Sequence, residues 1–224
     1  MKNQLHLLGL ISSVSIMMII GRVVAVENLG GVFLLWNLFL AWIPLGIAYL
    51  VDDMWRQRFL GKWGVIGGIS IWLLFFPNAP YLITDLIHLK AAPDYLIWYD
   101  ALMNFSFALA GLLTGLYSLL KVHRLIEQIW SGLLAWIAVS GSLVLSSYGV
   151  YLGRFGRWNS WDIVTDPFSL IQYSVSNLYD PLAIKLTIVF SFVMLVIYGA
   201  FWLRYRTSNA ECKHISQLGH YSFP

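Results

Sequence analysis

The sequence predicts an all-α protein: a polytopic transmembrane helix bundle of about six spans, plus a short interfacial or re-entrant helix. Hydrophobic residues make up 59% of the chain, charged residues make up 11%, and the mean hydropathy is +0.71. These values are typical of polytopic membrane proteins and exclude a water-soluble globular domain. We therefore expect one transmembrane domain over residues 1–206 and a polar cytoplasmic tail over residues 207–224.

Six apolar stretches predict the spans in chain order. The first covers residues 5–24 and begins like a signal peptide, but no small-residue cleavage site follows it, so we interpret it as a retained span. The other five spans are predicted over residues 31–50, 59–76, 95–120, 129–152 and 182–203.

The stretch FFPNAPYLITDLIHLK, residues 75–90, lies between the third and fourth predicted spans. Its apolar run is too short to cross a bilayer alone, and Pro77 and Pro80 interrupt continuous helix hydrogen bonding. We therefore expect an interfacial or re-entrant segment that forms an amphipathic helix on the outer side, capped by Asn78. The polar face of this helix carries Tyr81, Thr84, Asp85 and His88.

Polar residues also enter the predicted spans. Asp100 and Asn104 begin the fourth span, where a carboxylate at membrane depth costs about 2.5–3.5 kcal/mol and should face the bundle interior. Asn37 of the second span is expected to bond to another helix, and Tyr151 ends the polar stripe of the fifth. The halves of the spans toward the other membrane side are nearly featureless, so the sequence places the polar residues at one side.

Arginines lie near the ends of two predicted spans. Arg154 and Arg157 follow the fifth span, where a guanidinium suits a phosphate or a carboxylate ligand. They equally suit interfacial anchors, and either could pair with Asp100 in a structural ion pair. Arg22, near the end of the first span, is expected to snorkel to the interface.

Basic residues predict the orientation of the bundle, because Lys and Arg are in excess in cytoplasmic loops. With a cytoplasmic N-terminus, the inner segments hold Lys2, Arg56, Arg58, Lys62, Lys121, Arg124, Arg204, Arg206 and Lys213. The outer segments then hold Arg22, Lys90, Arg154, Arg157 and Lys185. This distribution predicts that both termini are cytoplasmic, and it accounts for the basic pI of about 9.0 without a nucleic-acid partner.

Three blocks of sequence resemble an uncharacterised family of bacterial membrane proteins, DUF1361. They are WNLFLAWIPL (residues 36–45), FFPNAPYLITDLIHL (residues 75–89) and SSYGVYLGRFGRWNSWDI (residues 146–163). The resemblance implies a multi-pass protein of the bacterial inner (plasma) membrane. It implies no activity that could be transferred to these residues.

The polar residues of the outer side predict one site. We expect Asp85, His88, Asp100, Asn104 and Arg154 to line a single cavity open to that side, with at least one contact between a carboxylate and an arginine. The candidate catalytic residues are Asp85, His88 and Asp100. The candidate substrate-binding residues are Asn37, Asn78, Tyr81, Asn104, Tyr151, Arg154 and Arg157.

Two classes of function fit this pattern. The first is an outward-facing site that binds or modifies an anionic lipid, an envelope precursor or another small molecule, with the enzymatic role left open. The second is a small transporter or permease subunit, which would need polar residues at both leaflets. Asp85 and His88 alone leave a metal shell unfilled, and nothing in the sequence requires Asp100 as a third ligand, so no metal site is predicted. The sequence leaves the cofactor unknown. The lipid bilayer is the one partner that the composition requires.

Overall fold

The computed structural model describes residues 2–87 and 94–219, without the side chains of residues 2, 94 and 209–219. The helices that form the spans are α1 (Lys2–Val26), α2 (Phe33–Arg56), α3 (Lys62–Phe75), α4 (Asn78–Thr84), α5 (Ile97–Ile129), α6 (Gly132–Phe155) and α9 (Pro181–Gly219). The 3₁₀ helix η2 (Asp94–Leu96) precedes α5, and the short helices α7 (Asp162–Thr165) and α8 (Pro167–Ser176) connect α6 to α9.

Six segments of the described chain are long and apolar enough to cross a membrane. This confirms the predicted all-α bundle of six spans. The third span runs from residue 62 to residue 87 and contains both α3 and α4. The second and fourth spans extend beyond their predicted ends, because α2 continues to Arg56 and α5 continues to Ile129.

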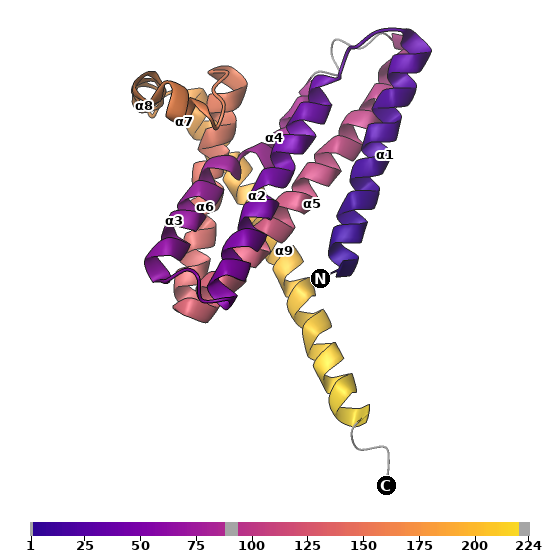
Figure 1. The fold of residues 1–224 in the computed structure, drawn as a ribbon. Coiled ribbons are helices and arrows are strands. Elements are labelled where there is room, and N and C mark those ends of the chain that lie inside the picture. Colours follow the sequence, from indigo (N-terminus) through magenta and orange to yellow (C-terminus); the bar gives the residue numbers. More distant parts are fainter. Residues whose placement is uncertain (1, 88–93, 220–224) are drawn as a thin grey trace.

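Helix α5 lies at the centre of the bundle and contacts α1, α2, α4 and α6 (Figure 1). Its buried residues include Phe107, Ala110 and Leu119. Helix α9 packs mainly against α6 and exposes most of its apolar surface, as a helix facing lipid does. The core therefore forms around α5, and the sites described below lie beside this helix.

The predicted surface position of the stretch at residues 75–90 is wrong for its described part. Ala79 and Leu82 of α4 are fully buried, and α4 packs against α5 near the middle of that helix. A Cβ on Gly111 of α5 would lie 2.7 Å from the carbonyl oxygen of Ala79, so only glycine allows this approach. The third span is thus a broken helix whose second half lies inside the bundle.

The prolines explain how the helix breaks and then resumes. Pro77 has no N–H group to bond to the carbonyl one turn earlier, so α3 ends at Phe75. Pro80 lies in the first turn of α4, where a missing N–H costs nothing. The chain therefore bends at residues 76 and 77 and continues across the membrane.

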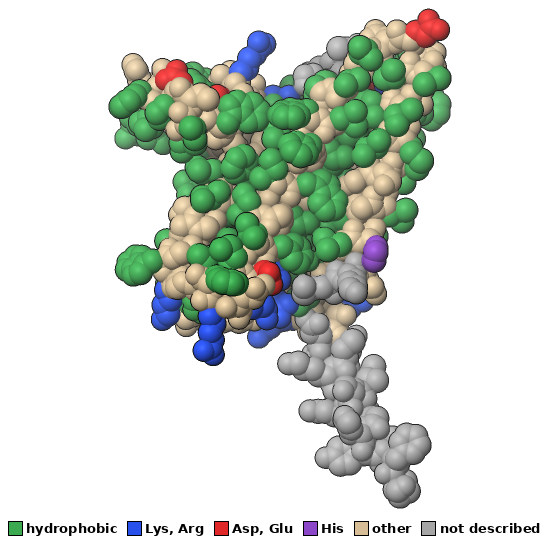
Figure 2. Space-filling model, viewed as in Figure 1, with side chains coloured by type: hydrophobic (Ala, Val, Ile, Leu, Met, Phe, Trp, Pro, Cys, Tyr) green, Lys and Arg blue, Asp and Glu red, His purple; other side chains and the backbone are tan. Residues whose placement is uncertain are grey.

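The two ends of the bundle differ in charge. We call the end where α2 stops at Arg56 and α3 starts at Lys62 the basic end, and the end that carries α7 and α8 the loop end. Most of the Lys and Arg side chains visible in Figure 2 gather at the basic end, which is the lower end in that view. Helices α7 and α8 lie across the loop end (Figure 1) and expose apolar side chains such as Phe168 and Ile171.

Candidate functional site: a cavity beside the broken helix

The break between α3 and α4 leaves backbone carbonyl groups without helical partners, and side chains satisfy two of them. Ser160 Oγ donates to the carbonyl oxygen of Leu74 at 2.8 Å. Asn78 Nδ2 donates to the carbonyl oxygen of Phe75 and to Ser160 Oγ, each at 2.9 Å. Asn78 thus bonds the end of α3, and the predicted N-cap role is wrong, because Pro77 occupies the N-cap of α4. These bonds also tie the segment after α6 to the break.

A cavity of about 340 Å³ lies beside the break, between α2, α3, α4, α6 and the segment that follows α6. Its polar lining consists of Asn37, Asn78, Tyr81, Trp158, Asn159 and Ser160. Its apolar lining is dominated by Leu40, Leu73, Leu74, Leu145, Leu152 and Leu170. The cavity thus offers hydrogen-bonding groups and hydrocarbon together, which is typical of small-molecule sites.

Two lining residues, Gly149 and Trp158, differ from the rest of the wall in their packing and hydrogen bonding. Gly149 lets α6 approach the break closely, because a Cβ there would lie 2.9 Å from Cγ of Pro77. The indole Nε1 of Trp158 is buried and has no hydrogen-bond partner in the described part of the chain. A buried donor without a partner is costly, so this group is an unusual feature of the cavity wall.

Asp85 and Arg154 form a buried ion pair close to this cavity. Arg154 Nη2 lies 2.5 Å from Asp85 Oδ1, and only 1% of the Asp85 side chain is exposed. Asn37 Nδ2 donates to the other carboxylate oxygen at 2.9 Å. Arg154 also donates to Thr84 Oγ1 at 2.6 Å, and its guanidinium lies 4.4 Å from the ring centroid of Tyr81. The predicted contact between a carboxylate and an arginine is confirmed, as is the bond from Asn37 to another helix.

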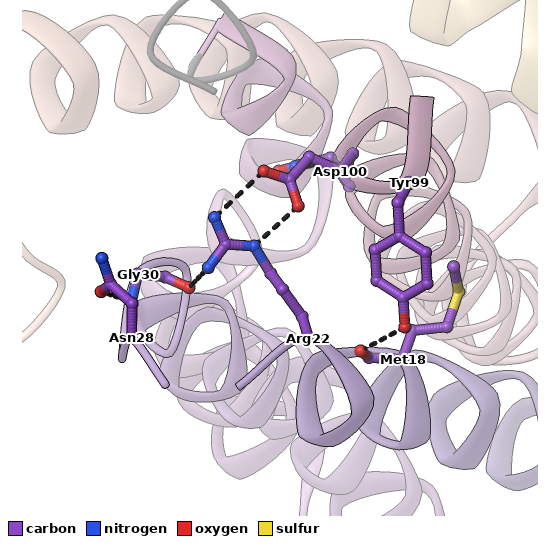
Figure 3. Close-up of polar contacts among 7 residues, drawn as sticks. Met18, Arg22, Asn28, Gly30, Tyr99 and Asp100 are labelled. Carbon is purple, nitrogen blue, oxygen red and sulfur yellow. Dashed lines mark hydrogen bonds and ion pairs between the residues drawn. The ribbon is translucent and has the colours of Figure 1, made fainter. Parts of the chain in front are cut away.

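Asp100 has a different arginine partner. Arg22 Nε donates to Asp100 Oδ1 at 2.7 Å, and Arg22 Nη2 donates to Oδ2 at 3.1 Å (Figure 3). Arg22 Nη1 also donates to the carbonyl oxygen of Gly30, and the Tyr99 hydroxyl donates to the carbonyl oxygen of Met18. Arg22 is buried, so the expectation that it snorkels to the interface is wrong. These bonds fasten α1 and the following loop to α5.

The polar residues of the loop end are therefore divided between two ion pairs. Asn104 lies with Asp100, because its Nδ2 donates to the Asp100 carbonyl oxygen at 2.7 Å, while its Oδ1 is buried without a described partner. Asp85 and Arg154 lie with Asn37, Thr84 and Tyr81 instead. Of the predicted residues, Asn37, Asn78 and Tyr81 line the cavity beside the break. Asp85, Asp100, Asn104 and Arg154 are not part of its lining, so the structure does not bring them together in this cavity as predicted.

The remaining predicted residues occupy separate positions. The Tyr151 hydroxyl donates to Asp180 Oδ2 at 2.5 Å, and this bond holds the pKa of the Asp180 carboxyl below its usual value. Arg157 is exposed and has a φ of 58°, in the left-handed region. His88 lies outside the described residues. Within the described chain, no group of three or more His, Cys, Asp or Glu side chains is placed to hold a metal ion.

The charged residues of the basic end were predicted to lie in cytoplasmic loops, because the second and fourth spans were expected to end at residues 50 and 120. Asp52 is buried there and contacts both Lys121 Nζ at 2.5 Å and Arg56 Nε at 2.9 Å. The sequence signal for the position of Lys121 was the apolar periodicity that continues past residue 120. It would have placed Lys121 on the helix instead of in a loop.

Comparison with known protein families matches residues 36–197 to a family described as "Protein of unknown function (DUF1361)". Neither a curated protein nor a solved structure matches the chain.

Proposed function

This chain belongs to the DUF1361 family and is an integral membrane protein, and we propose that it binds a lipid-like amphiphile in the cavity beside the broken helix. The observation that carries this proposal is the divided lining of the cavity. Asn78, Tyr81 and Asn159 offer hydrogen-bonding groups beside a wall of leucine side chains. Such a lining suits a molecule with a polar head group and an apolar chain.

The charges around the cavity favour an uncharged head group over the anionic one that the sequence suggested. No charged side chain lies in the described lining. Arg154 is held by Asp85 and Thr84, and this ion pair carries no net charge. A buried anion without a cationic partner is costly. Hydroxyl and amide groups of a ligand would find donors and acceptors there without this cost.

The contacts of the candidate catalytic residues favour binding over acid–base catalysis. A general acid or base must reach the proton that it transfers. Asp85 instead accepts bonds from Arg154 and Asn37, and Asp100 accepts two bonds from Arg22. These contacts support structural roles for both carboxylates, so the proposal requires no reaction.

The charge distribution supports an extracytoplasmic position for the cavity. Basic residues concentrate at the basic end, and cytoplasmic segments carry the excess of Lys and Arg. The proposed orientation therefore places the basic end and both termini in the cytoplasm of a bacterial cell, with the chain in its inner membrane. The loop end, with the cavity, would then face the extracytoplasmic side.

A transporter is the second candidate, and the broken helix α3–α4 favours it. Discontinuous helices recur at the midplane sites of secondary transporters. Trp72, near the end of α3, and Phe76, in the break, are however fully buried and stack at 4.6 Å between ring centroids. A route would need this packed layer to open, whereas binding requires no such movement.

Photo-cross-linking of the full-length protein in nanodiscs tests the proposed binding. The probe is a monoacylglycerol with a diazirine in its acyl chain, and the labelled peptides are mapped by mass spectrometry. We expect labels on the segments that line the cavity, around residues 145–153 and 158–163. Leu145→Trp, which adds bulk in the lining, should lower this labelling about tenfold. Val144→Trp is the matched control, because Val144 is exposed on the same helix and does not line the cavity.

Labelling spread evenly over the lipid-facing helices would contradict the proposal. Equal labelling of the Leu145→Trp and Val144→Trp variants would contradict it as well. Both results would show that the probe samples the bilayer around the protein and does not enter the cavity.

A further inference from the structure

A second pocket, of about 830 Å³, lies at the basic end between α1, α2, α5 and α9. Its lining includes three cationic side chains and two carboxylates: Arg56, Lys121, Arg124, Asp52 and Asp53. This excess of positive charge distinguishes it from the cavity beside the break. The volume is within the range of pockets that hold small ligands, about 300–1,000 Å³.

One carboxylate of the pocket is already shared between two cations. Asp52 Oδ2 contacts Lys121 Nζ at 2.5 Å and Arg56 Nε at 2.9 Å, and 6% of the Asp52 side chain is exposed. Lys121 also lies 4.6 Å from the ring centroid of Tyr49. Asp53 is exposed and accepts a bond from Gln57 at 2.6 Å. These contacts fix Lys121 in the pocket wall. Because three cations face two carboxylates, the pocket keeps an excess of positive charge.

Arg124 is the cation that has capacity for a ligand. Its Nη1 donates to the Tyr205 hydroxyl at 2.5 Å, and its guanidinium lies 5.3 Å from the centroid of that ring. In the described chain, no carboxylate pairs with it. A guanidinium carries five N–H donors in a planar fork that matches a phosphate group. Tyr205 thus holds Arg124 in position, and most of its donors are unused by described residues.

The depth of the pocket indicates the kind of anion. It lies near the end of α2, with Tyr49, Tyr117 and Tyr205 in its lining. Tyrosine is enriched at the level of lipid head groups, where its ring is apolar and its hydroxyl is hydrated. Basic pockets between helices at this level suit phosphate-bearing head groups.

We propose that this pocket binds the phosphate of an anionic phosphate ester, with Arg124 as the main ligand and Lys121 as a second positive charge. The same chemistry could reach the pocket from the bilayer, as a phospholipid head group, or from the aqueous phase, as a soluble phosphate ester. The site differs from the cavity beside the break in place, charge and ligand, so the two proposals stand or fall separately.

Two binding measurements on the full-length protein test the proposal and identify the source. In the first, native mass spectrometry follows the binding of phosphatidylglycerol and of phosphatidylcholine to the detergent-solubilised protein. In the second, calorimetry follows the binding of soluble glycerol 3-phosphate. Arg124→Gln is the test variant. Lys62→Gln is the matched control, because Lys62 is exposed at the same end and does not line the pocket.

We expect Arg124→Gln to lower the affinity for the phosphate ester about tenfold, which corresponds to the loss of one charge-assisted hydrogen bond. Lys62→Gln should change it less than about twofold, because Lys62 does not line the pocket. If Arg124→Gln weakens the binding of phosphatidylglycerol only, the source of the phosphate ester is the lipid. If it weakens the binding of glycerol 3-phosphate, the source is soluble. Arg124→Lys keeps the charge and should bind more tightly than Arg124→Gln, which separates binding from a folding defect.

The proposal is overturned if phosphatidylglycerol binds no more tightly than zwitterionic phosphatidylcholine and glycerol 3-phosphate does not bind. It is also overturned if Arg124→Gln and Lys62→Gln weaken binding equally, because that result shows general attraction to a basic surface and no site.

Discussion

Replacing one partner of the buried ion pair between Asp85 and Arg154 should destabilise the bundle strongly. Replacing both partners should lower the free energy of unfolding by little more than replacing one. At 2.5 Å between Arg154 Nη2 and Asp85 Oδ1, with an effective dielectric constant of about 20, the Coulomb attraction is about 7 kcal/mol. Desolvation of the two groups offsets part of this attraction. Removal of one partner typically costs about 3–5 kcal/mol, because the other charge is left buried.

A double-mutant cycle measures this coupling. Asp85→Asn and Arg154→Gln should each lower the free energy of unfolding by about 3–5 kcal/mol. Independent sites would then give a loss of about 6–10 kcal/mol in the double variant. We expect a double-variant loss close to that of either single variant, and hence a coupling energy of about 3 kcal/mol or more. The assay is reversible unfolding of the purified protein in mixed micelles, with Lys62→Gln as the exposed control.

Additive losses in this cycle would refute the ion pair. So would single losses below about 1 kcal/mol, which is the range of exposed pairs.

Two further predictions concern helix packing and pH. Gly111→Ala should lower the free energy of unfolding by about 1–3 kcal/mol, because its Cβ would press against the Ala79 carbonyl oxygen. Gly46→Ala is the control and should not lower it, because a Cβ there meets nothing within 4 Å. Equal unfolding curves for both variants would contradict the close contact. Because the Tyr151 bond lowers the pKa of Asp180, it adds stability above the unfolded-state pKa of about 3.9 and loses this contribution as the pH falls through the lowered folded-state pKa. Tyr151→Phe should therefore flatten the melting temperature measured against pH below about pH 4, and an unchanged acid limb would contradict that reading.

The spans could be predicted from sequence because lipid requires long apolar helices whatever their neighbours are. The same length requirement led to the wrong position for the broken span. Judged alone, the stretch after Pro77 is too short to cross the membrane, but joined to α3 it completes a span of residues 62–87. Burial of α4 depends on Gly111, and their contact cannot be read from either segment alone.

The partners of the charged residues could not be predicted because they come from distant parts of the chain. Arg22 lies near the end of an apolar helix, where snorkelling is the usual behaviour. Its partner, Asp100, is brought to it only when α1 packs on α5. Asp85 and Arg154 were expected on the same side of the membrane, and this placement sufficed to predict a carboxylate–arginine contact.

The basic-end pocket was missed because two helices are longer than the hydropathy pattern indicates. We expected loops after residues 50 and 120, but α2 and α5 continue to Arg56 and Ile129. Asp52 and Lys121 therefore face each other between helices and are not loop charges.

A crystal structure grown from a lipidic mesophase doped with monoacylglycerol tests the central claim most directly. We predict density for one amphiphile in the cavity beside the break, with an oxygen of its head group within hydrogen-bond distance of Tyr81 or Asn159 and its chain along the leucine wall. A cavity closed by protein side chains, with ordered lipid bound only on the outer faces of the helices, would contradict the claim.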